Sequence, residues 1–492
     1  MTNTHSFRPS YAISLPSSRA QLDLSQIHQP NPRVRPGEKF LSYLPHSGFH
    51  NQRIALENAL ILARLLNRTL LVPPVRLGRV AIPYSNFNVL RQLQDANYVA
   101  YLCQLSGNAV KANNTAAVQP ALLDFPDLPE RCTQEGKRGP VTFTYLPWGW
   151  ITDFDSIRQL QPTIQTLGRA YFWAPSHLGP HSDDVLVIPD TSMYQYRFVD
   201  GVAPSPSSNP RSSIKTPYSE DIALASLVDN PAKLIQVGSL FGSHRLELSD
   251  PANKAVRKQI RRHMSLKHPL LQKLATDIAM KISGSGFLAA HFRCSDSHFL
   301  ETAKENSRMI WWKLVHGILG VSVGRTLQLE LNSSIAGDSS LPLQFTRYIS
   351  PSTSPAGLPF DHSTPTVGVG LTKTCNGELH TDPELEHLNT PLFIATDSKD
   401  PPTDERLSMF HRTFPCVFFL GDFPQEVKQV AAIRDPISGM EIGDMLVPFL
   451  DAMVVARAAR VVGTPRSTFS WYVQDILWRV NHGLDIKDRN GG

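Results

Sequence analysis

Short apolar runs alternate with segments of helical periodicity along most of this chain. An apolar run at residues 39–44 precedes a glycine-containing loop, and another run occupies residues 70–72. Between them, apolar residues recur at i, i+3, i+4, i+7 and i+10 from Leu56 to Leu66, the spacing of one helix face. The pattern predicts a strand, a helix from Asn51 to about Leu66 and a second strand, and a βαβ unit of this kind joins parallel strands.

The same alternation of short apolar runs and helical periodicity returns in the second half of the chain. Strands are predicted at residues 234–239, 287–292, 392–395, 416–420 and 460–462, and helices at residues 442–457 and 468–479. A chain of 492 residues exceeds the size at which one core usually divides. We therefore predict an α/β fold with two doubly wound domains, at residues 37–240 and 241–485.

Two stretches depart from this texture. Residues 1–36 are polar and rich in proline, which predicts a flexible N-terminal segment. Residues 331–390 shift to Ser, Pro, Thr and Gly, which predicts a flexible insertion on the surface of the second domain. No apolar run approaches the length of a signal-peptide core or a bilayer span, so we expect no membrane span in this chain.

Composition narrows the function classes. The chain is 41% apolar and 18% charged, as in soluble globular proteins, with a net charge of +5. Its densest basic stretch, residues 257–267, also has apolar residues at helical spacing and is interpreted as a solvated helix face. Because no aromatic residues interleave the basic ones and no nucleic-acid module is visible, we expect no nucleic-acid partner.

The five cysteines are widely separated and form no close-spaced ligand pattern, so we predict no metal site. Cys103 and Cys132 could bridge within the first domain in an oxidising compartment.

A permanent cation follows the predicted strand at residues 287–292. Arg293 comes directly after it, and Asp296 follows three residues later. Ligands of open α/β sheets collect outside the carboxyl ends of the strands, and a guanidinium fork matches phosphate oxygens. An anionic ligand is the first interpretation, and an ion pair that orders the loop is the alternative.

Two further segments also favour an anion. The loop at residues 45–50 leads into a helix whose first N–H groups are free. After the last predicted strand, residues 463–470 place Ser467 and Thr468 at the start of the next helix, where hydroxyl and backbone N–H groups can cradle a phosphate. In the alternative, Ser467 or Thr468 only caps that helix.

Together these segments resemble the protein O-fucosyltransferase superfamily, enzymes that use GDP-fucose and have the GT-B architecture of two facing Rossmann-like domains. The matching blocks are Gly48-Phe49-His50-Asn51-Gln52 with residues 65–74, His291-Phe292-Arg293-Cys294-Ser295-Asp296, residues 393–398 and residues 463–470. They follow the order of the family and span most of residues 39–480.

The resemblance implies a donor site on these residues. Arg293 would hold the β-phosphate and the glycosidic oxygen, and Asn51 would lie close to the reacting sugar. Asp451 would read guanine, with an ordinary exposed helix carboxylate as the alternative. The other implied donor-binding residues are Gly48, Phe49, His291, Asp296, Ser467, Thr468 and Phe469.

Two departures from the family pattern bear on the chemistry. Some relatives have a glutamate in the first loop, whereas this loop has no carboxylate, so His46 or His50 is the candidate base. We assign His50 to the catalytic residues, and a simple surface histidine is the alternative. Cys294 stands where some glycan-directed members have a second arginine, so one contact to the donor phosphate would be absent.

The resemblance implies a glycosyltransferase that moves fucose from GDP-fucose to a hydroxyl of a protein or glycan, with inversion and with neither a metal nor a cofactor. Three alternatives stay open. They are a metal-dependent transferase that uses Asp153 and Asp155, a catalytically silent nucleotide-sugar or glycan-binding protein, and a scaffold built on the insertion. Relatives work in the secretory pathway, although no entry signal is visible here.

Overall fold

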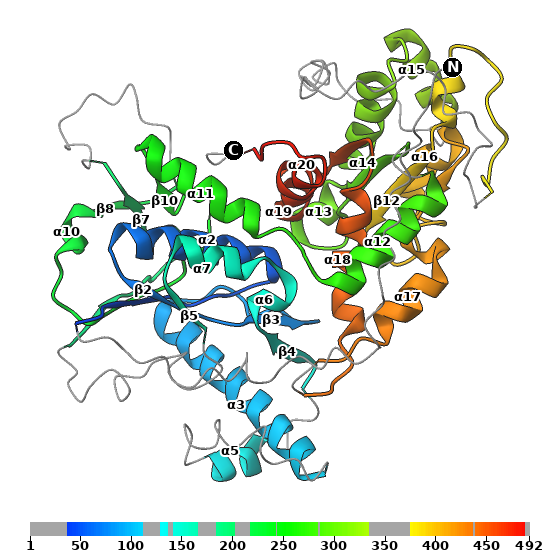
Figure 1. Cartoon of the computed structure of the whole chain (residues 1–492). Helices are drawn as coiled ribbons and strands as arrows, with labels where there is room; N and C mark the ends of the chain where they lie inside the picture. The colour runs from blue at the N-terminus through cyan, green and yellow to red at the C-terminus, as the bar shows by residue number, and fades with distance from the viewer. Residues whose placement is uncertain are drawn as a thin grey trace, which may run out of the picture.

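The computed structural model describes residues 37–111, 128–135, 141–165, 184–201, 217–242, 244–283, 286–333, 374–435 and 438–487. The predicted N-terminal segment, residues 1–36, lies outside the described residues, as do residues 334–373 of the predicted insertion. Figure 1 shows the described chain from its first strand to its last helix.

The first half of the chain forms a five-stranded parallel sheet in the order β5-β2-β1-β9-β6. Its strands are β1 (Phe40–Ser42), β2 (Thr69–Val72), β5 (Thr163–Gln165), β6 (Val185–Ile188) and β9 (Leu234–Val237). The connection from β1 to β2 is the helix α2 (Phe49–Leu65), so the predicted βαβ unit is confirmed. Its apolar face is buried, as the spacing indicated.

The second half forms a four-stranded parallel sheet in the order β13-β12-β11-β14. Its strands, close to the predicted ones, are β11 (Leu288–Phe292), β12 (Leu392–Thr396), β13 (Val417–Phe418) and β14 (Arg460–Gly463). Alternate residues of β11 belong to two different apolar clusters, with Leu288, Ala290 and Phe292 in one and Ala289 in the other. Helices therefore cover both faces of this sheet, as is usual for parallel sheets.

Helices surround both sheets. Those with eight residues or more, besides α2, are α3 (Phe87–Lys111), α5 (Leu128–Glu135), α11 (Pro251–His263), α12 (Pro269–Ile282), α14 (Ala303–Trp312), α15 (Val323–Ser333), α17 (Pro424–Ala431) and α18 (Gly443–Val455). The predicted helix at residues 468–479 is divided into α19 (Thr468–Trp471), the π-helical η8 (Tyr472–Leu477) and α20 (Trp478–Asn481). The two smaller sheets are β3 (Val75–Gly78) with β4 (Phe143–Leu146), and β7 (Tyr196–Val199) with β8 (Glu220–Ala223) and β10 (Leu246–Glu247).

The two sheets share buried apolar surface. One cluster of buried side chains extends from Leu41 in the first sheet to Phe393 in the second. The mixed α/β character with parallel sheets is thus confirmed, and the division at residues 240 and 241 stays a prediction. None of the described helices combines the length and apolar character needed to cross a bilayer.

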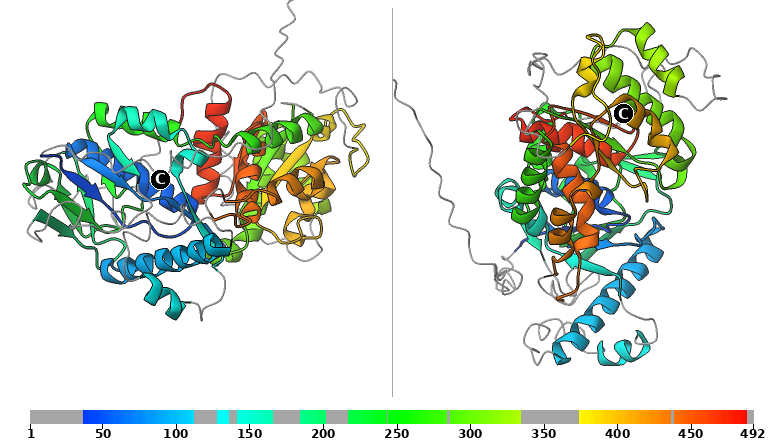
Figure 2. Two further views of the ribbon diagram at one scale, coloured as in Figure 1. Left: turned by 60° about the horizontal axis from the view of Figure 1, so that its bottom comes forward. Right: turned by 90° about the vertical axis from the view of Figure 1, so that its right-hand side faces the viewer.

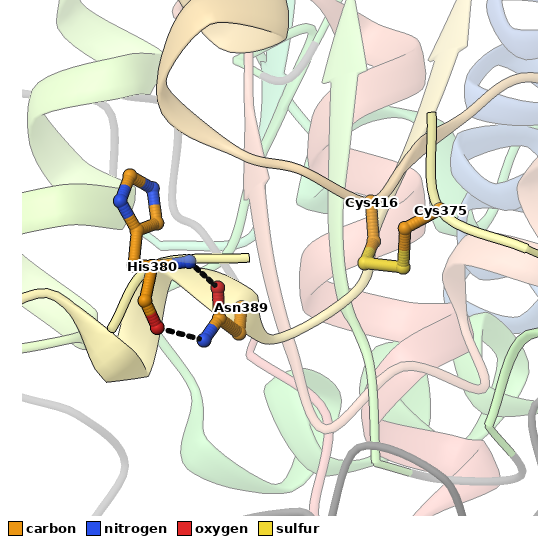
Figure 3. Close-up of a disulfide and its surroundings, with 4 residues drawn as sticks. All are labelled: Cys375, His380, Asn389 and Cys416. Atoms are coloured by element: carbon orange, nitrogen blue, oxygen red, sulfur yellow. Dashed lines mark hydrogen bonds between the residues drawn. A yellow bond between two sulfur atoms is a disulfide. The ribbon is translucent and has the colours of Figure 1, made fainter. Parts of the chain in front are cut away.

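Two disulfides tie peripheral segments to the fold. Cys103 of α3 is bonded to Cys132 of α5, which confirms the expected pair, and α5 lies beside the far end of α3 (Figures 1 and 2). Cys375 is bonded to Cys416, at the start of β13, a pair that the sequence did not indicate (Figure 3). Nearby, the side chain of Asn389 accepts from the backbone N–H of His380 at 2.8 Å and donates to its carbonyl at 2.9 Å. Cys294 is free and buried.

The basic stretch at residues 257–267 is the predicted solvated face only in part, because Arg262 and Lys267 are exposed but two other arginines are not. Arg257 and Arg261 are only 2% and 7% exposed. Arg261 Nε donates to Glu57 Oε2 of α2 at 3.1 Å, and Arg53 of α2 pairs with the same carboxylate. The prediction was wrong for these two arginines because Glu57, two hundred residues earlier, supplies a buried counter-charge that local periodicity cannot reveal.

Candidate functional site

A cavity of about 550 Å³ lies where loops from both sheets meet, a size typical of small-molecule sites. The first half of the chain contributes the loop before α2 and part of β3, and the second half contributes the loop after β11, part of α18 and the loop after β14. The predicted site residues that line it are Gly48, Phe49, His50, Asn51, Arg293, Ser467, Thr468 and Phe469. His291, Asp296 and Asp451 do not line it.

His50 occupies an aromatic cage at the boundary between the two halves. Its ring lies 5.0 Å from that of Phe49, 4.5 Å from Phe469 and 4.9 Å from Tyr472, measured between ring centroids. Neither ring nitrogen has a hydrogen-bond partner among the described residues. Burial lowers the pKa of His50 well below its usual range, and the charges of Arg53 and Arg293 lower it further. The imidazole is therefore neutral at ordinary pH, and the same lowering makes it a weaker base than a solvent-exposed histidine.

Arg293 forms the ion pair that was the alternative interpretation, and it also lines the cavity. Its Nε donates to Asp296 Oδ1 at 3.0 Å and its Nη2 to Asp296 Oδ2 at 2.6 Å. Its guanidinium carbon lies 5.3 Å from the centre of the Phe299 ring. Hydrogen bonds from Arg293 hold the pKa of Asp296 below its usual value. Asp296 thus positions the guanidinium from outside the cavity.

Ser467 and Phe469 hold the loop after β14 in place. Ser467 Oγ accepts from the backbone N–H of Ser470 at 3.3 Å, so the capping that was the alternative reading does occur. The Phe469 ring stacks on His291 at 4.4 Å with an interplanar angle of 23°. His291 Nδ1 is 2.6 Å from Ser470 Oγ, and burial, with the nearby Arg293, lowers the pKa of His291 to about 3. His291 is therefore a neutral support beneath Phe469.

Asp451 is buried in α18 and is not the exposed carboxylate of the alternative interpretation. It is 9% exposed, and its Oδ1 has no hydrogen-bond partner among the described residues. Burial raises the pKa of Asp451 well above the ordinary carboxyl value. A buried, unsatisfied carboxyl away from the cavity wall destabilises the free protein.

Sequence reasoning missed several charged residues of the cavity, namely Arg76, Arg79, Asp444 and Arg466. Arg79 Nη2 of the first half donates to Asp444 Oδ2 of the second at 2.8 Å, and both side chains are over 70% exposed. Arg466 is exposed, has a φ of +60°, and has no ion-pair or hydrogen-bond partner within the described ranges. Its position next to Ser467, inside a block already singled out, was the available signal. Cations outnumber carboxylates on the cavity wall, which favours an anionic ligand.

The carboxylates of the metal-dependent alternative, Asp153 and Asp155, do not line the cavity. Asp153 Oδ2 accepts from Lys267 Nζ at 2.6 Å and His263 Nδ1 at 3.1 Å. Although burial acts in the opposite direction, hydrogen bonds from Lys267, Ser156 and His263 lower the pKa of Asp153 to about 2. The ammonium group of Lys267 therefore already pairs with this carboxylate.

Gly463→Ala is expected to destabilise the site. A Cβ at Gly463 would lie 2.6 Å from Ser470 Cβ and 2.9 Å from Gln474 Nε2, so the helix that carries Phe469 must shift. Overpacking of this kind costs about 1–3 kcal/mol, measurable as a lower urea midpoint. Gly324→Ala is the control, because a Cβ there meets nothing within 4 Å. Equal stability of both variants would contradict the close packing.

One short sequence match relates this chain to a known protein. No protein-family model matches the chain. A segment of 39 residues is 59% identical to O-fucosyltransferase 30 of Arabidopsis thaliana, a match that spans 8% of each protein. Crystal structures of POFUT1 with GDP-fucose and with GDP are 10% identical over 92% of this chain and 96% of theirs, with TM-scores of 0.35 and 0.37. Scores of this size carry no argument about the fold, which rests on the sheets above. The recognisable similarity is to O-fucosyltransferases, as the sequence blocks predicted.

Proposed function

We propose that the chain is a glycosyltransferase of the GT-B type that transfers fucose from GDP-fucose to a hydroxyl of a protein or glycan. The observation that carries this proposal is the single cavity that receives Asn51, Arg293 and Thr468 from segments far apart in the sequence. These are the segments that resemble O-fucosyltransferases. Two arginines, Arg293 and Arg466, face it from the second half, which suits a diphosphate.

The proposed reaction needs charge stabilisation on the leaving group. As the bond between the sugar carbon and the β-phosphate oxygen breaks, its electrons pass to GDP, and negative charge grows on the phosphate. The guanidinium of Arg293, held in orientation by Asp296, donates to this oxygen. Because the protein supplies fixed cations here, we propose that no metal is needed.

Acceptor activation is assigned to the other wall of the cavity. The acceptor oxygen attacks the sugar carbon on the face opposite to GDP, which inverts the configuration, and its proton passes to His50. Asn51, one residue further along α2, orients the sugar or the acceptor through its amide. His50 is assigned this role because it lines the cavity beside Asn51, and its lowered pKa makes it a weak base in the free protein.

The cellular setting is part of the proposal. Disulfides persist mainly in oxidising compartments, so the pairs Cys103–Cys132 and Cys375–Cys416 support a site of action in the secretory pathway.

A catalytically silent binding protein is the second candidate, favoured by the aromatic cage that encloses the His50 nitrogens. Calorimetric titration with GDP-fucose, GDP-mannose and UDP-glucose, in the presence of a chelator, is the first test. We expect selective GDP-fucose binding, followed by slow release of fucose to water. Binding without any turnover would favour the silent protein, and loss of binding on chelation would favour a metal-dependent enzyme. No binding of any GDP-sugar by the folded protein would overturn the proposal.

A further inference from the structure

A chain of hydrogen bonds runs behind the first-half wall of the cavity. The backbone N–H of Phe241 donates to Ser239 Oγ at 3.2 Å, and Ser239 Oγ lies 2.7 Å from His46 Nε2. His46 Nδ1 in turn lies 2.7 Å from Ser47 Oγ. His46 and Ser239 are 3% and 2% exposed, whereas Ser47 and Phe241, at the two ends, line the cavity. The two end residues of this hydrogen-bond series, Phe241 and Ser47, therefore both lie at the cavity.

The direction of these bonds follows from counting donors. Ser239 Oγ is buried, and its partners among the described residues are the Phe241 N–H, from which it accepts, and His46 Nε2, so the hydroxyl hydrogen has its acceptor at His46 Nε2. A neutral imidazole has one N–H, which then sits on Nδ1 and donates to Ser47 Oγ. The hydroxyl hydrogen of Ser47 then has no acceptor within this series of hydrogen bonds and can point into the cavity.

Surrounding groups keep His46 neutral and fixed. Burial, together with the charge of Arg245, lowers the pKa of His46 to about 4. Arg245 is itself paired with the buried Asp190 at 3.1 Å. The rings of Tyr84 and Phe241 meet the imidazole edge-on at 5.3 and 5.5 Å, so it has little freedom to turn.

The backbone of Ser47 is also held in an uncommon conformation. Its φ is +64°, a region that side chains other than glycine, asparagine and aspartate seldom adopt. Its N–H donates to the Ile82 carbonyl at 2.7 Å, and its carbonyl accepts from Gln52 Nε2 at 3.0 Å. Strain that persists at a cavity wall points to a role for the side chain.

We propose that Ser47 is a ligand-contacting residue whose hydroxyl donates to an oxygen of the carbohydrate, and that His46 is the residue that positions it. The proposal rests on the function proposed above. The phosphates are assigned to Arg293 and Arg466 of the second half, whereas Ser47 belongs to the first. The first-half arginines of the cavity are already engaged, Arg76 with Val80 and Asn97 and Arg79 with Asp444. The oxygen belongs either to the transferred sugar or to the acceptor.

The tautomer of His46 is the first test and needs no substrate. In the full chain labelled with ¹⁵N-histidine, with the His46 signals assigned from a His46→Gln variant, we expect a neutral Nδ1–H imidazole between pH 6 and 8. An Nε2–H tautomer, or a charged ring in that pH range, would contradict the direction assigned to these hydrogen bonds and would overturn the proposal.

Substitution of Ser47 is the second test. Ser47→Ala and Ser47→Gly both remove the hydroxyl, but only glycine also relieves the positive φ. We expect both variants to bind GDP-fucose about 3- to 10-fold more weakly with GDP unchanged if the sugar is the partner. If the acceptor is the partner, its KM rises by a similar factor while GDP-fucose binding is unchanged. Unaltered constants in both assays would overturn the proposal and leave a structural role.

His46 variants separate positioning from packing. The amide nitrogen of asparagine reaches the place of Nδ1, whereas that of glutamine reaches the place of Nε2. His46→Asn should therefore keep most of the GDP-fucose affinity, or the acceptor KM, of the unaltered protein. His46→Gln should show the same weakening as Ser47→Ala. Failure of the glycosyltransferase function is recognised separately, because the unaltered protein would then bind no GDP-sugar. If Arg293→Ala loses GDP-fucose binding while the Ser47 variants keep both the GDP-fucose affinity and the acceptor KM of the unaltered protein, only the present proposal fails.

Discussion

Replacing Arg293 with alanine is expected to weaken GDP-fucose binding about 10- to 100-fold and to slow turnover by a further 100- to 1,000-fold. The binding loss reflects charge-assisted bonds to the diphosphate, and the larger rate loss reflects charge that develops only as the sugar leaves. In addition, the change removes the counter-charge of Asp296, which stays close to the cavity and repels the anionic donor. Donor affinity is measured by calorimetry and turnover by fucose release to water.

Two companion variants show whether the guanidinium itself matters. Arg293→Lys keeps the charge but loses the fork that Asp296 orients, so it should recover part of the affinity and little of the rate. Asp296→Asn keeps the guanidinium, so the fold-reduction in turnover should be no more than a tenth of the fold-reduction caused by Arg293→Ala. An Arg293→Ala protein that is folded and retains donor affinity and rate would show that the ion pair only orders the loop.

The location of the site was predictable because parallel strands end at one edge of their sheet. β11 and β14 are paired directly, with His291 opposite Gly463, so Arg293 and the loop that carries Ser467 must emerge side by side. The βαβ unit follows from the spacing of Leu56, Ala59 and Ala63 in the same way. In both cases the relevant pattern is local, or depends only on a general rule for sheets.

Other features depend on partners that no local pattern reveals. Arg261 is buried because Glu57 lies opposite it on another helix, and Cys375 is near Cys416 only once β13 has joined the sheet. On α18, Asp444 and Asp451 are seven residues apart and so lie on the same side of the helix, yet Asp444 lines the cavity near the start of the helix and Asp451, two turns later, is buried. Packing of α18 against α12 and α17 decides which of its residues are buried and which line the cavity, and the sequence of α18 alone does not.

Asp451→Asn is expected to stabilise the free protein by about 1–3 kcal/mol at pH 7, because asparagine has no proton to hold and so avoids the cost of keeping a buried carboxyl protonated above the pKa of the unfolded chain. Burial raises the pKa of Asp451 in the folded chain, whereas the unfolded chain ionises near pH 4. The unaltered protein therefore loses stability as the pH rises above about 4, and the advantage of the variant should grow from pH 4 to pH 7. Urea unfolding at several pH values measures this. Asp444→Asn, on the same helix but exposed, should give no such gain.

The same variant tests whether Asp451 reads guanine. If the carboxylate accepts the paired N–H groups of the base, GDP binding must ionise it, so binding should release up to one proton, which calorimetry in buffers of different ionisation enthalpy detects. IDP, whose base lacks the exocyclic amino group, should bind the unaltered protein about 10-fold more weakly than GDP. Asp451→Asn should release no proton and should lose both GDP affinity and the preference over IDP. A more stable variant that keeps the affinity and the preference would show that Asp451 is a buried carboxyl with no part in the recognition of the base.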